Sequence, residues 1–456
     1  MWYNLLLVIE KYNMEESDFM NAAIISDHFK KRKPSGVRLG QIKFSERKDK
    51  PELINTAIGN VSLPMNPAMQ KRMFELNAAD SPFSKGVVQY APTPGFPETQ
   101  DAFKNILKSE GFDTSNLFVQ ITNGGSSAME LTILGVCGDS GSGEKPLLTI
   151  DPTYTNYNSF AERLGRNIVS VGRGLEDDGT FTLPELEKIE EIIKKHKPGA
   201  LLVIPYDNPT GQLYDYQTLK ELASLCVKYN LWLVSDEAYR ELYYDDDKPL
   251  VSIWGLSNED VPGIEGRRIS IETASKVWNG CGLRVGAIIT DNEEYYNKTV
   301  YEYTADLCAS AIGQYIFGAL AHESKEDIID WCKKLRNHYK TMMFKLHDGL
   351  KEAEPNLIVS SPDAAIYMAV DVKNVVGPGF DSTDFVMYCA EEGSVKHNGV
   401  DTTLLVAPLK GFYKVDQGQD NPGLTQMRIA MVESPENMEK VPEIFVKLLR
   451  QYEEKR

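Results

Sequence analysis

The segment GALLVIPYDNPTG, residues 199–211, decides the fold class of this chain. Its first half is a continuous apolar run, the pattern of a strand that is buried on both faces of a sheet. Strands of this kind occur in parallel sheets that helices cover on both sides. Its second half is rich in turn-forming residues, so we expect a strand over 199–206 that leads into a polar loop.

The flanking sequence repeats this strand and alternates it with helical patterns. LPELEKIEEIIKKHK, residues 183–197, has apolar residues at 186, 189, 192 and 193, on one face of a helix. LWLVSDEAY, residues 231–239, is again an apolar run that ends in polar residues. Strands that alternate with helices form a mostly parallel sheet with helices on both faces. We expect further strands over 145–154, 166–172 and 267–276, and helices over 156–165 and 214–230.

The C-terminal part has the pattern of an α+β unit. Its expected elements are a long helix, three strands and a final helix, at 325–353, 365–372, 403–409, 426–432 and 435–454. The predicted fold class is therefore α/β, with a large domain over 76–322 that holds the mostly parallel sheet and a smaller α+β domain over 323–456. Residues 1–75 are expected to pack with the small domain, which would make that domain discontinuous.

Composition and charge argue against several classes of protein. The 456 residues are 42% hydrophobic and 25% charged, which is ordinary for a soluble globular chain. The net charge of −17 repels phosphate backbones, so we expect no nucleic-acid partner. No apolar run is long enough to span a membrane, so we expect no membrane association.

The six cysteines contain no C-x-x-C pair and are widely scattered. This spacing fits neither a zinc site nor a disulfide framework, so we expect no metal, reduced thiols and a cytoplasmic location. The apolar N-terminus MWYNLLLVIEKYN has no basic segment and no cleavage site of a signal peptide. We expect a short helix there, unless translation begins at Met14.

Polar side chains follow three of the expected strands. Asn208 follows the strand at 199–206, Asp236 and Tyr239 follow the apolar run at 231–235, and Lys276 follows the run at 268–273. In open parallel sheets, ligands bind beyond the carboxyl ends of the strands. These side chains therefore indicate one binding site at that edge of the sheet.

Each of these patterns has a structural alternative. TNGGSSAME, residues 122–130, is typical of a helix N-terminus that binds an anion, although most glycine-rich turns are only turns. Lys276 could form a Schiff base with an aldehyde or be a solvated lysine. The hydroxyls of Thr273 and Ser275 and the guanidinium of Arg284 favour the first reading, since they could bind a phosphate. Asp236 could pair with a pyridinium nitrogen or cap the next helix.

The motifs DNPTG, SDEAY, SK and GLRVG occur in this order, with 28 residues from Asn208 to Asp236, 40 from Asp236 to Lys276 and 8 from Lys276 to Arg284. In this set and spacing the chain resembles the class I/II aminotransferases, which are fold type I enzymes that use pyridoxal 5′-phosphate. The resemblance covers roughly residues 50–440. Several separated motifs are far more specific than any one of them.

The resemblance implies the catalytic groups. Lys276 would hold the cofactor aldehyde as a Schiff base and then shuttle the proton of the substrate α-carbon. Asp236 would keep the pyridine nitrogen protonated, so that the ring accepts electrons. Asn208 and Tyr239 would hydrogen-bond the ring 3-oxygen and lower the pKa of the Schiff base.

The resemblance also implies the binding groups. The phosphate would be bound by Gly125, Ser126, Thr273, Ser275 and Arg284, and Tyr154 would stack on the ring. Tyr90 would reach the phosphate in the neighbouring subunit, which implies a homodimer. Gly59, Asn208 and Arg428 would bind the substrate, with Arg428 as a bidentate clamp on its carboxylate. The alternative for Arg428 is a salt bridge on the edge of a sheet.

The resemblance implies an aminotransferase that moves the amino group of an L-amino acid to a 2-oxo acid. The same cofactor site also supports other reactions: β-elimination as in a C–S lyase, decarboxylation or cyclopropane-forming elimination. A regulatory protein that has kept the fold is a further alternative, although only about 50 residues precede the region of resemblance, too few for a good DNA-binding module, and the chain as a whole is acidic. Ala364–Ala365 and Leu409–Lys410 depart from the family pattern near the substrate pocket, so the amino donor stays open.

Overall fold

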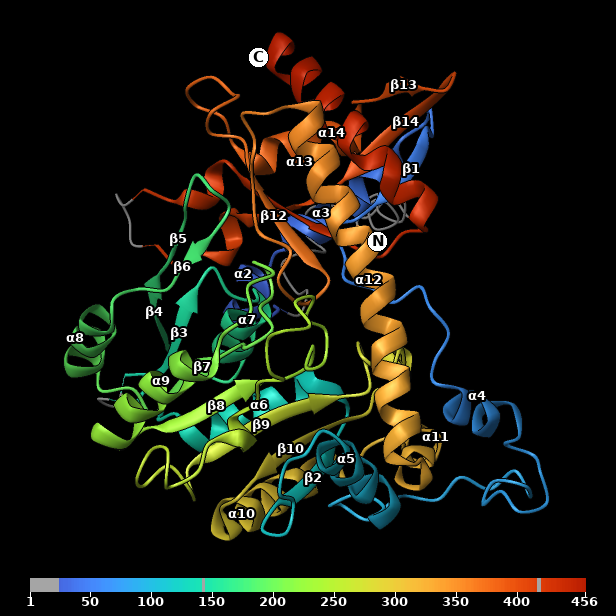
Figure 1. The fold of residues 1–456 in the computed structure, drawn as a ribbon, viewed down its shortest axis with the longest axis vertical. Helices are drawn as coiled ribbons and strands as arrows, with labels where there is room; N and C mark the ends of the chain where they lie inside the picture. The colour runs from blue at the N-terminus through green and yellow to red at the C-terminus, as the bar shows by residue number, and fades with distance from the viewer. Residues whose placement is uncertain (1–23, 142–143, 416–419) are drawn as a thin grey trace.

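The computed structural model describes residues 24–141, 144–415 and 420–456 (Figure 1). Its largest sheet has seven strands in the order β2-β10-β9-β8-β7-β3-β4. Neighbouring strands are parallel except at β10, which runs antiparallel to β2 and to β9. The expected α/β fold with a mostly parallel sheet is confirmed. The strands are Phe118–Thr122 (β2), Leu147–Asp151 (β3), Ile168–Gly172 (β4), Ala200–Val203 (β7), Trp232–Asp236 (β8), Arg268–Thr273 (β9) and Gly286–Thr290 (β10).

Helices cover both faces of this sheet because its strands are apolar on both sides. Successive strand residues point to opposite faces, so Leu147 packs into one core and Leu148 into the other. The first core lies under α6 (Gly124–Val136), α7 (Asn156–Arg163) and α10 (Glu293–Tyr303). The second lies under α5 (Pro97–Ser109), α8 (Leu186–His196) and α9 (Tyr216–Lys228).

The C-terminal unit contains two smaller sheets. One has the order β11-β12-β16-β15, with strands Ile358–Val359, Tyr367–Asp371, Gln426–Ala430 and Ala407–Pro408. The other has the order β1-β14-β13, with strands Glu52–Asn55, Val400–Leu405 and Val395–His397. Helix α12 (Lys325–Ala353) runs from the large sheet to this unit, where α13 (Ser382–Glu391) and α14 (Pro435–Lys455) complete it (Figure 1).

The single strand expected over 403–409 is wrong. β14 ends at Leu405 and pairs with β1, whereas β15 pairs with β16 in the other sheet. Both halves are buried, so the apolar run continues across the break and the sequence does not mark it.

The N-terminal residues contact both units. β1 pairs in parallel with β14, and α3 (Gly36–Glu46) packs on α13, whereas α4 (Pro67–Phe74) packs on α11 (Ala311–Gly318). The helix expected at 1–13 and the alternative start at Met14 lie outside the described residues. Among the residues that are described, no helix is long and apolar enough to cross a membrane. The remaining short elements are α2 (Asp27–Lys31), β5 (Gly174–Leu175) and β6 (Phe181–Thr182).

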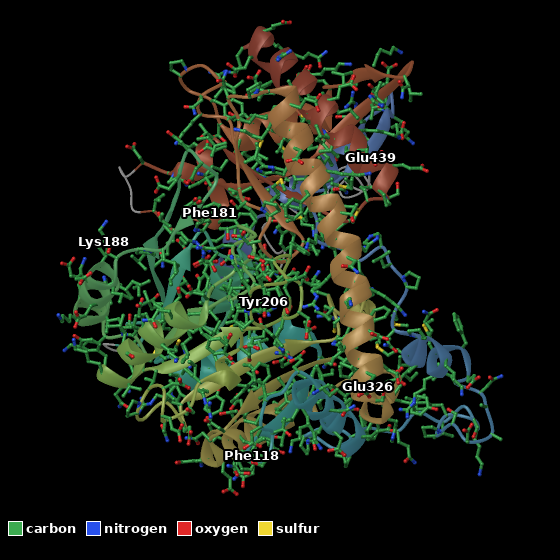
Figure 2. The ribbon with its side chains drawn as sticks, viewed as in Figure 1. Phe118, Phe181, Lys188, Tyr206, Glu326 and Glu439 are labelled. Carbon is green, nitrogen blue, oxygen red and sulfur yellow. The ribbon has the colours of Figure 1, made fainter. Side chains whose placement is uncertain are left out.

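The carboxyl ends of the large sheet's parallel strands face the junction with the C-terminal unit. Tyr206, three residues beyond β7, lies in the middle of the molecule between the two (Figure 2). Its side chain is fully buried and its hydroxyl donates to the Val251 carbonyl at 3.0 Å. The loops after β7 and β8 contact the smaller unit directly, since the N–H groups of Ala364 and Ala365 donate to the carbonyls of Gly211 at 2.7 Å and Leu242 at 2.8 Å.

Candidate active site

A cavity of about 300 Å³ lies at this junction. All but one of the thirteen predicted site residues line it: Gly59, Gly125, Ser126, Tyr154, Asn208, Asp236, Tyr239, Thr273, Ser275, Lys276, Arg284 and Arg428. They come from the loop after β1, the start of α6, the ends of β3, β7, β8 and β9, the loop before β10, and β16. The strand ends of one parallel sheet therefore bring together residues that are far apart in sequence.

One end of the cavity offers hydrogen-bond donors to an anion. Helix α6 begins at Gly124, and the N–H groups of its first turn have no partner within the helix. Thr273 Oγ1 lies 2.7 Å from Ser275 Oγ. Arg284 donates to the carbonyls of Cys281 at 2.9 Å and Asn123 at 3.4 Å. No ion pair joins Arg284 to a carboxylate in the described part of the chain.

The backbone at this end leaves room for the guanidinium. A Cβ on Gly124 would lie 2.5 Å from Nη2 of Arg284, so only glycine lets the two approach. Gly124 also has φ +79°, a conformation that side chains disfavour. Arg284 itself adopts φ +54°, which turns its side chain back toward the start of α6.

Asp236 ends β8 and has two donors but no cation. Its Oδ2 accepts from the Tyr157 hydroxyl at 2.6 Å, and its Oδ1 accepts from the Ala238 N–H at 3.2 Å. No helix begins here, so the capping alternative reduces to one hydrogen bond in a turn. Burial raises the pKa of Asp236, while the Tyr157 hydroxyl lowers it. A buried carboxyl with this environment is suited to a cationic N–H from a ligand.

Tyr157 is a site residue that the sequence did not reveal. It lies on α7, where its ring packs edge-on against Tyr154 with centroids 5.4 Å apart. Burial raises the pKa of Tyr154 to about 12, so its phenol is neutral and accepts from Asn156 at 2.7 Å. The sequence predicted a helix over 156–165, but nothing in it indicated a partner on β8.

Lys276 is half-buried inside the cavity. Its Nζ donates to the carbonyl of Gly59, on the opposite wall. No acidic side chain forms an ion pair with it among the described residues. A lysine without a carboxylate partner in a partly closed site is well placed to react as an amine.

Arg428 is buried, at 5% exposure, and has only neutral acceptors. Its Nη1 donates to Asn208 Oδ1 and its Nη2 to the Ala57 carbonyl, both at 2.8 Å. Its Nε has no hydrogen-bond partner within the described chain. β16 lies between β12 and β15, so the alternative of a sheet-edge salt bridge is wrong. A buried guanidinium with a free donor is suited to a carboxylate ligand.

Aromatic residues complete the wall around Arg428. The guanidinium lies 4.2 Å from the ring centre of Tyr367 and 5.3 Å from that of Phe412. The Tyr367 hydroxyl lies 2.6 Å from that of Tyr239. The sequence marked these two regions only as departures from the family pattern, at Ala364–Ala365 and Leu409–Lys410, and gave no role to Tyr367 or Phe412.

Tyr90 is the predicted site residue that the structure does not bring to the cavity of its own chain. Its side chain is 80% exposed, next to the exposed Val87 and Val88. Three exposed apolar side chains within four residues form a small apolar patch on the surface.

Comparisons with known proteins agree with this geometry. Residues 53–398 match the family model for aminotransferase class I and II. The chain is 28% identical over 360 residues to the probable aspartate aminotransferase of Methanocaldococcus jannaschii, which covers 76% of this chain and 85% of the relative. It is 30% identical over 256 residues to the 2-aminoadipate transaminase of Thermus thermophilus, covering 56% and 58%.

Solved structures share the fold. A single mutant of Thermus thermophilus aspartate aminotransferase matches with a TM-score of 0.76 at 20% identity, over 94% of this chain and all of that one. N-succinyldiaminopimelate aminotransferase from Mycobacterium tuberculosis matches with a TM-score of 0.75 at 20% identity, over 93% and 100%. Because the family model spans most of the sequence, this chain belongs to the class I and II aminotransferases, enzymes that move an amino group from an amino acid to a 2-oxo acid.

Proposed function

We propose that this aminotransferase works with pyridoxal 5′-phosphate bound in the Lys276 cavity. The observation that carries the proposal is a set of unmatched charges in one cavity. Asp236 has no cation, while Arg284 and Arg428 have no carboxylate among the described residues. A ligand with a phosphate, a basic ring nitrogen and a substrate carboxylate nearby would complement all three.

The residues fit this cofactor at each of its ends. The first turn of α6, Thr273, Ser275 and Arg284 offer donors to the phosphate. Asp236, held by Tyr157, would keep the ring nitrogen protonated. When bound, pyridoxal phosphate supplies an aldehyde and a ring that accepts electrons.

The chain itself supplies the base and the clamp. Lys276 Nζ is proposed to take the proton from the substrate α-carbon and to return it during transfer. Arg428 and Asn208 would bind the α-carboxylate and so fix the α-carbon near Nζ. Tyr239 and Asn208 would donate to the ring oxygen, Tyr154 would cover the ring, and Gly59 would leave space beside the carboxylate.

We propose acidic amino acids as the first donors to test. The Methanocaldococcus jannaschii relative is named for aspartate. Arg38 of α3 lines the same cavity, and among the residues that the structure describes its guanidinium donates only to Gln41 Oε1, at 3.1 Å. A second carboxylate could pair with it. Arg38→Gln should lower kcat/KM for aspartate about tenfold while leaving alanine nearly unchanged, and equal losses on both would contradict this assignment.

We also propose the assembly and location expected from the sequence. A homodimer would cover the exposed Val87, Val88 and Tyr90 and bring Tyr90 to the neighbouring subunit's phosphate site. The proposed division places residues 76–322 in the large domain and 323–456 in the small domain. Residues 1–75 would pack with the small domain. Six free thiols support a cytoplasmic location.

The test uses purified protein with pyridoxal phosphate, an amino donor and a 2-oxo acid. The loaded protein should be yellow, its absorption band should shift on adding the donor alone, and the acceptor should restore it. Lys276→Ala should bind the cofactor but lose the shift and the turnover. Lys340→Ala, which removes a surface lysine paired with Asp246, should retain both. Ammonia or pyruvate released without an acceptor would instead favour β-elimination, and carbon dioxide would favour decarboxylation.

A further inference from the structure

Tyr367 contacts Tyr239 and Arg428, the residues proposed to bind the ring oxygen and the substrate carboxylate. It begins β12 and is only 2% exposed. Its hydroxyl lies 2.6 Å from the Tyr239 hydroxyl, and the Arg428 guanidinium lies 4.2 Å from its ring centre. One side chain therefore joins the group proposed for the ring oxygen to the group proposed for the substrate carboxylate.

The position of the Tyr367 hydroxyl is fixed by its surroundings. A Cβ on Gly59 would lie 1.9 Å from this oxygen, so the hydroxyl occupies the space over the glycine. The rings of Tyr367 and Tyr239 meet edge-on at 74°, with centroids 5.4 Å apart. Just before the strand, Ala365 has φ +56°, and its carbonyl accepts from the Tyr244 hydroxyl. The turn that aims Tyr367 into the cavity is thus held on its other side.

The direction of the hydrogen bond between the two tyrosines has a functional consequence. A phenol has one proton to donate and two lone pairs that accept. If Tyr239 donated to Tyr367, it would have no proton left for the cofactor. The Arg428 cation near the Tyr367 ring draws electron density from that phenol, which makes it the better donor. In the opposite direction, Tyr367 donates and Tyr239 keeps its proton.

We propose that Tyr367 is a positioning residue that donates to Tyr239 and so directs the Tyr239 proton to the cofactor ring oxygen. Its ring also holds the Arg428 guanidinium in the orientation that binds the substrate carboxylate. The inference rests on the proposed function. A donor that itself accepts a hydrogen bond is strengthened, so the ring oxygen would be more stable as an anion. The role of Tyr367 should therefore be visible in the pH at which the bound cofactor loses its proton, as well as in turnover.

The first test compares Tyr367→Phe with Tyr413→Phe. Tyr413 is a buried tyrosine outside the cavity lining whose hydroxyl donates to Gln426 Oε1 at 2.6 Å, so it is a matched control. The readout is the pH midpoint at which the absorption band of the cofactor-loaded protein changes. Tyr367→Phe should raise the midpoint by about half to one pH unit, the size of one lost hydrogen bond. Tyr413→Phe should leave it in place, and an unchanged midpoint in Tyr367→Phe would overturn the inference.

The second test asks whether Tyr367 acts through Tyr239. In a Tyr239→Phe background, the added Tyr367→Phe change should shift the midpoint no further, whereas two additive shifts would contradict the relay. Tyr367→Leu, which also removes the ring, should raise the KM for the amino donor about tenfold above that of Tyr367→Phe. Equal KM values would refute the role toward Arg428. Wild-type protein that takes up no pyridoxal phosphate would overturn the proposed function itself, which distinguishes the two failures.

Discussion

Two buried arginines in this molecule have the same exposure and opposite surroundings. Arg428 and Arg240 are each 5% exposed. Arg240, just beyond β8, donates to Glu110 and Glu237 at 2.7 Å and to Glu272 at 2.6 Å. Within the described ranges, Arg428 donates only to an amide oxygen and a backbone carbonyl. Arg240 thus has three carboxylate partners for one positive charge, whereas the partners of Arg428 within the described residues are both neutral.

We propose that this difference separates an arginine with a structural role from one that binds a ligand. Around Arg240, three acids that follow α5, follow β8 and lie on β9 join segments distant in sequence, and Glu237 also accepts from Ser252. Around Arg428, the described residues place no carboxylate, and the proposed substrate would supply one. Burial alone therefore does not distinguish the two arginines, whereas the number of carboxylates that pair with each one does.

Breaking the structural site should have the largest effect. Arg240→Met would leave three buried carboxylates without their cation, which costs about 3–5 kcal/mol of unfolding free energy. Urea denaturation should show this loss. The control Arg32→Met removes an exposed pair with Glu162 and should change stability by less than about 1 kcal/mol. A stable Arg240→Met protein would show that the acids are held neutral by their surroundings.

Breaking the ligand site should affect catalysis and spare the fold. Arg428→Gln should lower kcat/KM by about 30- to 1,000-fold, because it removes the proposed partner of the substrate carboxylate. Its midpoint in urea should stay close to that of the wild type, since no acid is left unpaired. Steady-state kinetics with an amino donor measure the first quantity. Full activity in this variant would show that Arg428 does not bind the substrate carboxylate.

The acid excess around Arg240 should make stability depend on pH. Burial raises the pKa of Glu110 to about 8 and that of Glu272 to about 7, from an ordinary value of 4.5. The folded state thus binds more protons than the unfolded state, and stability is lost as pH rises from about 4.5 to 8. Unfolding free energy should fall by on the order of 1–3 kcal/mol between pH 6 and pH 8. Glu110→Gln should flatten this profile, and a wild-type profile that rises with pH would refute the assignment.

The smallest effect should come from removing the hydrogen bond that Asp236 accepts from Tyr157. Tyr157→Phe removes the hydroxyl that donates to Asp236 at 2.6 Å and leaves the ring in its core. Cofactor affinity should weaken about 5- to 30-fold, the range of a hydrogen bond to a charged group. Fluorescence titration with pyridoxal phosphate measures it. Tyr295→Phe, on the same side of the sheet and outside the cavity, should bind as the wild type does.

The sequence predicted the parts of the molecule that depend on local pattern. Apolar strands that alternate with helices indicated the large sheet, and Asn208, Asp236 and Lys276 were expected together because each follows such a strand. β10 was not anticipated, since its short apolar run lies within the stretch that also holds the site residues. The break at Val406 was missed because the apolar pattern continues through it.

Contacts between distant segments could not be predicted in this way. Tyr157 meets Asp236 across 79 positions, and Tyr239 meets Tyr367 across 128. Such pairs depend on side-chain direction and on how two units dock, which no local period encodes. The Arg240 cluster was missed for the same reason, because its acids lie on three separate segments.

The contact between Gly59 and Tyr367 predicts how the two positions vary in evolution. No side chain larger than hydrogen fits at position 59 while the tyrosine hydroxyl fills the adjacent space. A substitution at 59 would therefore survive selection only after residue 367 had become smaller. Among descendants of this gene the two positions should change together and in that order, a historical dependence between residues separated by more than three hundred positions.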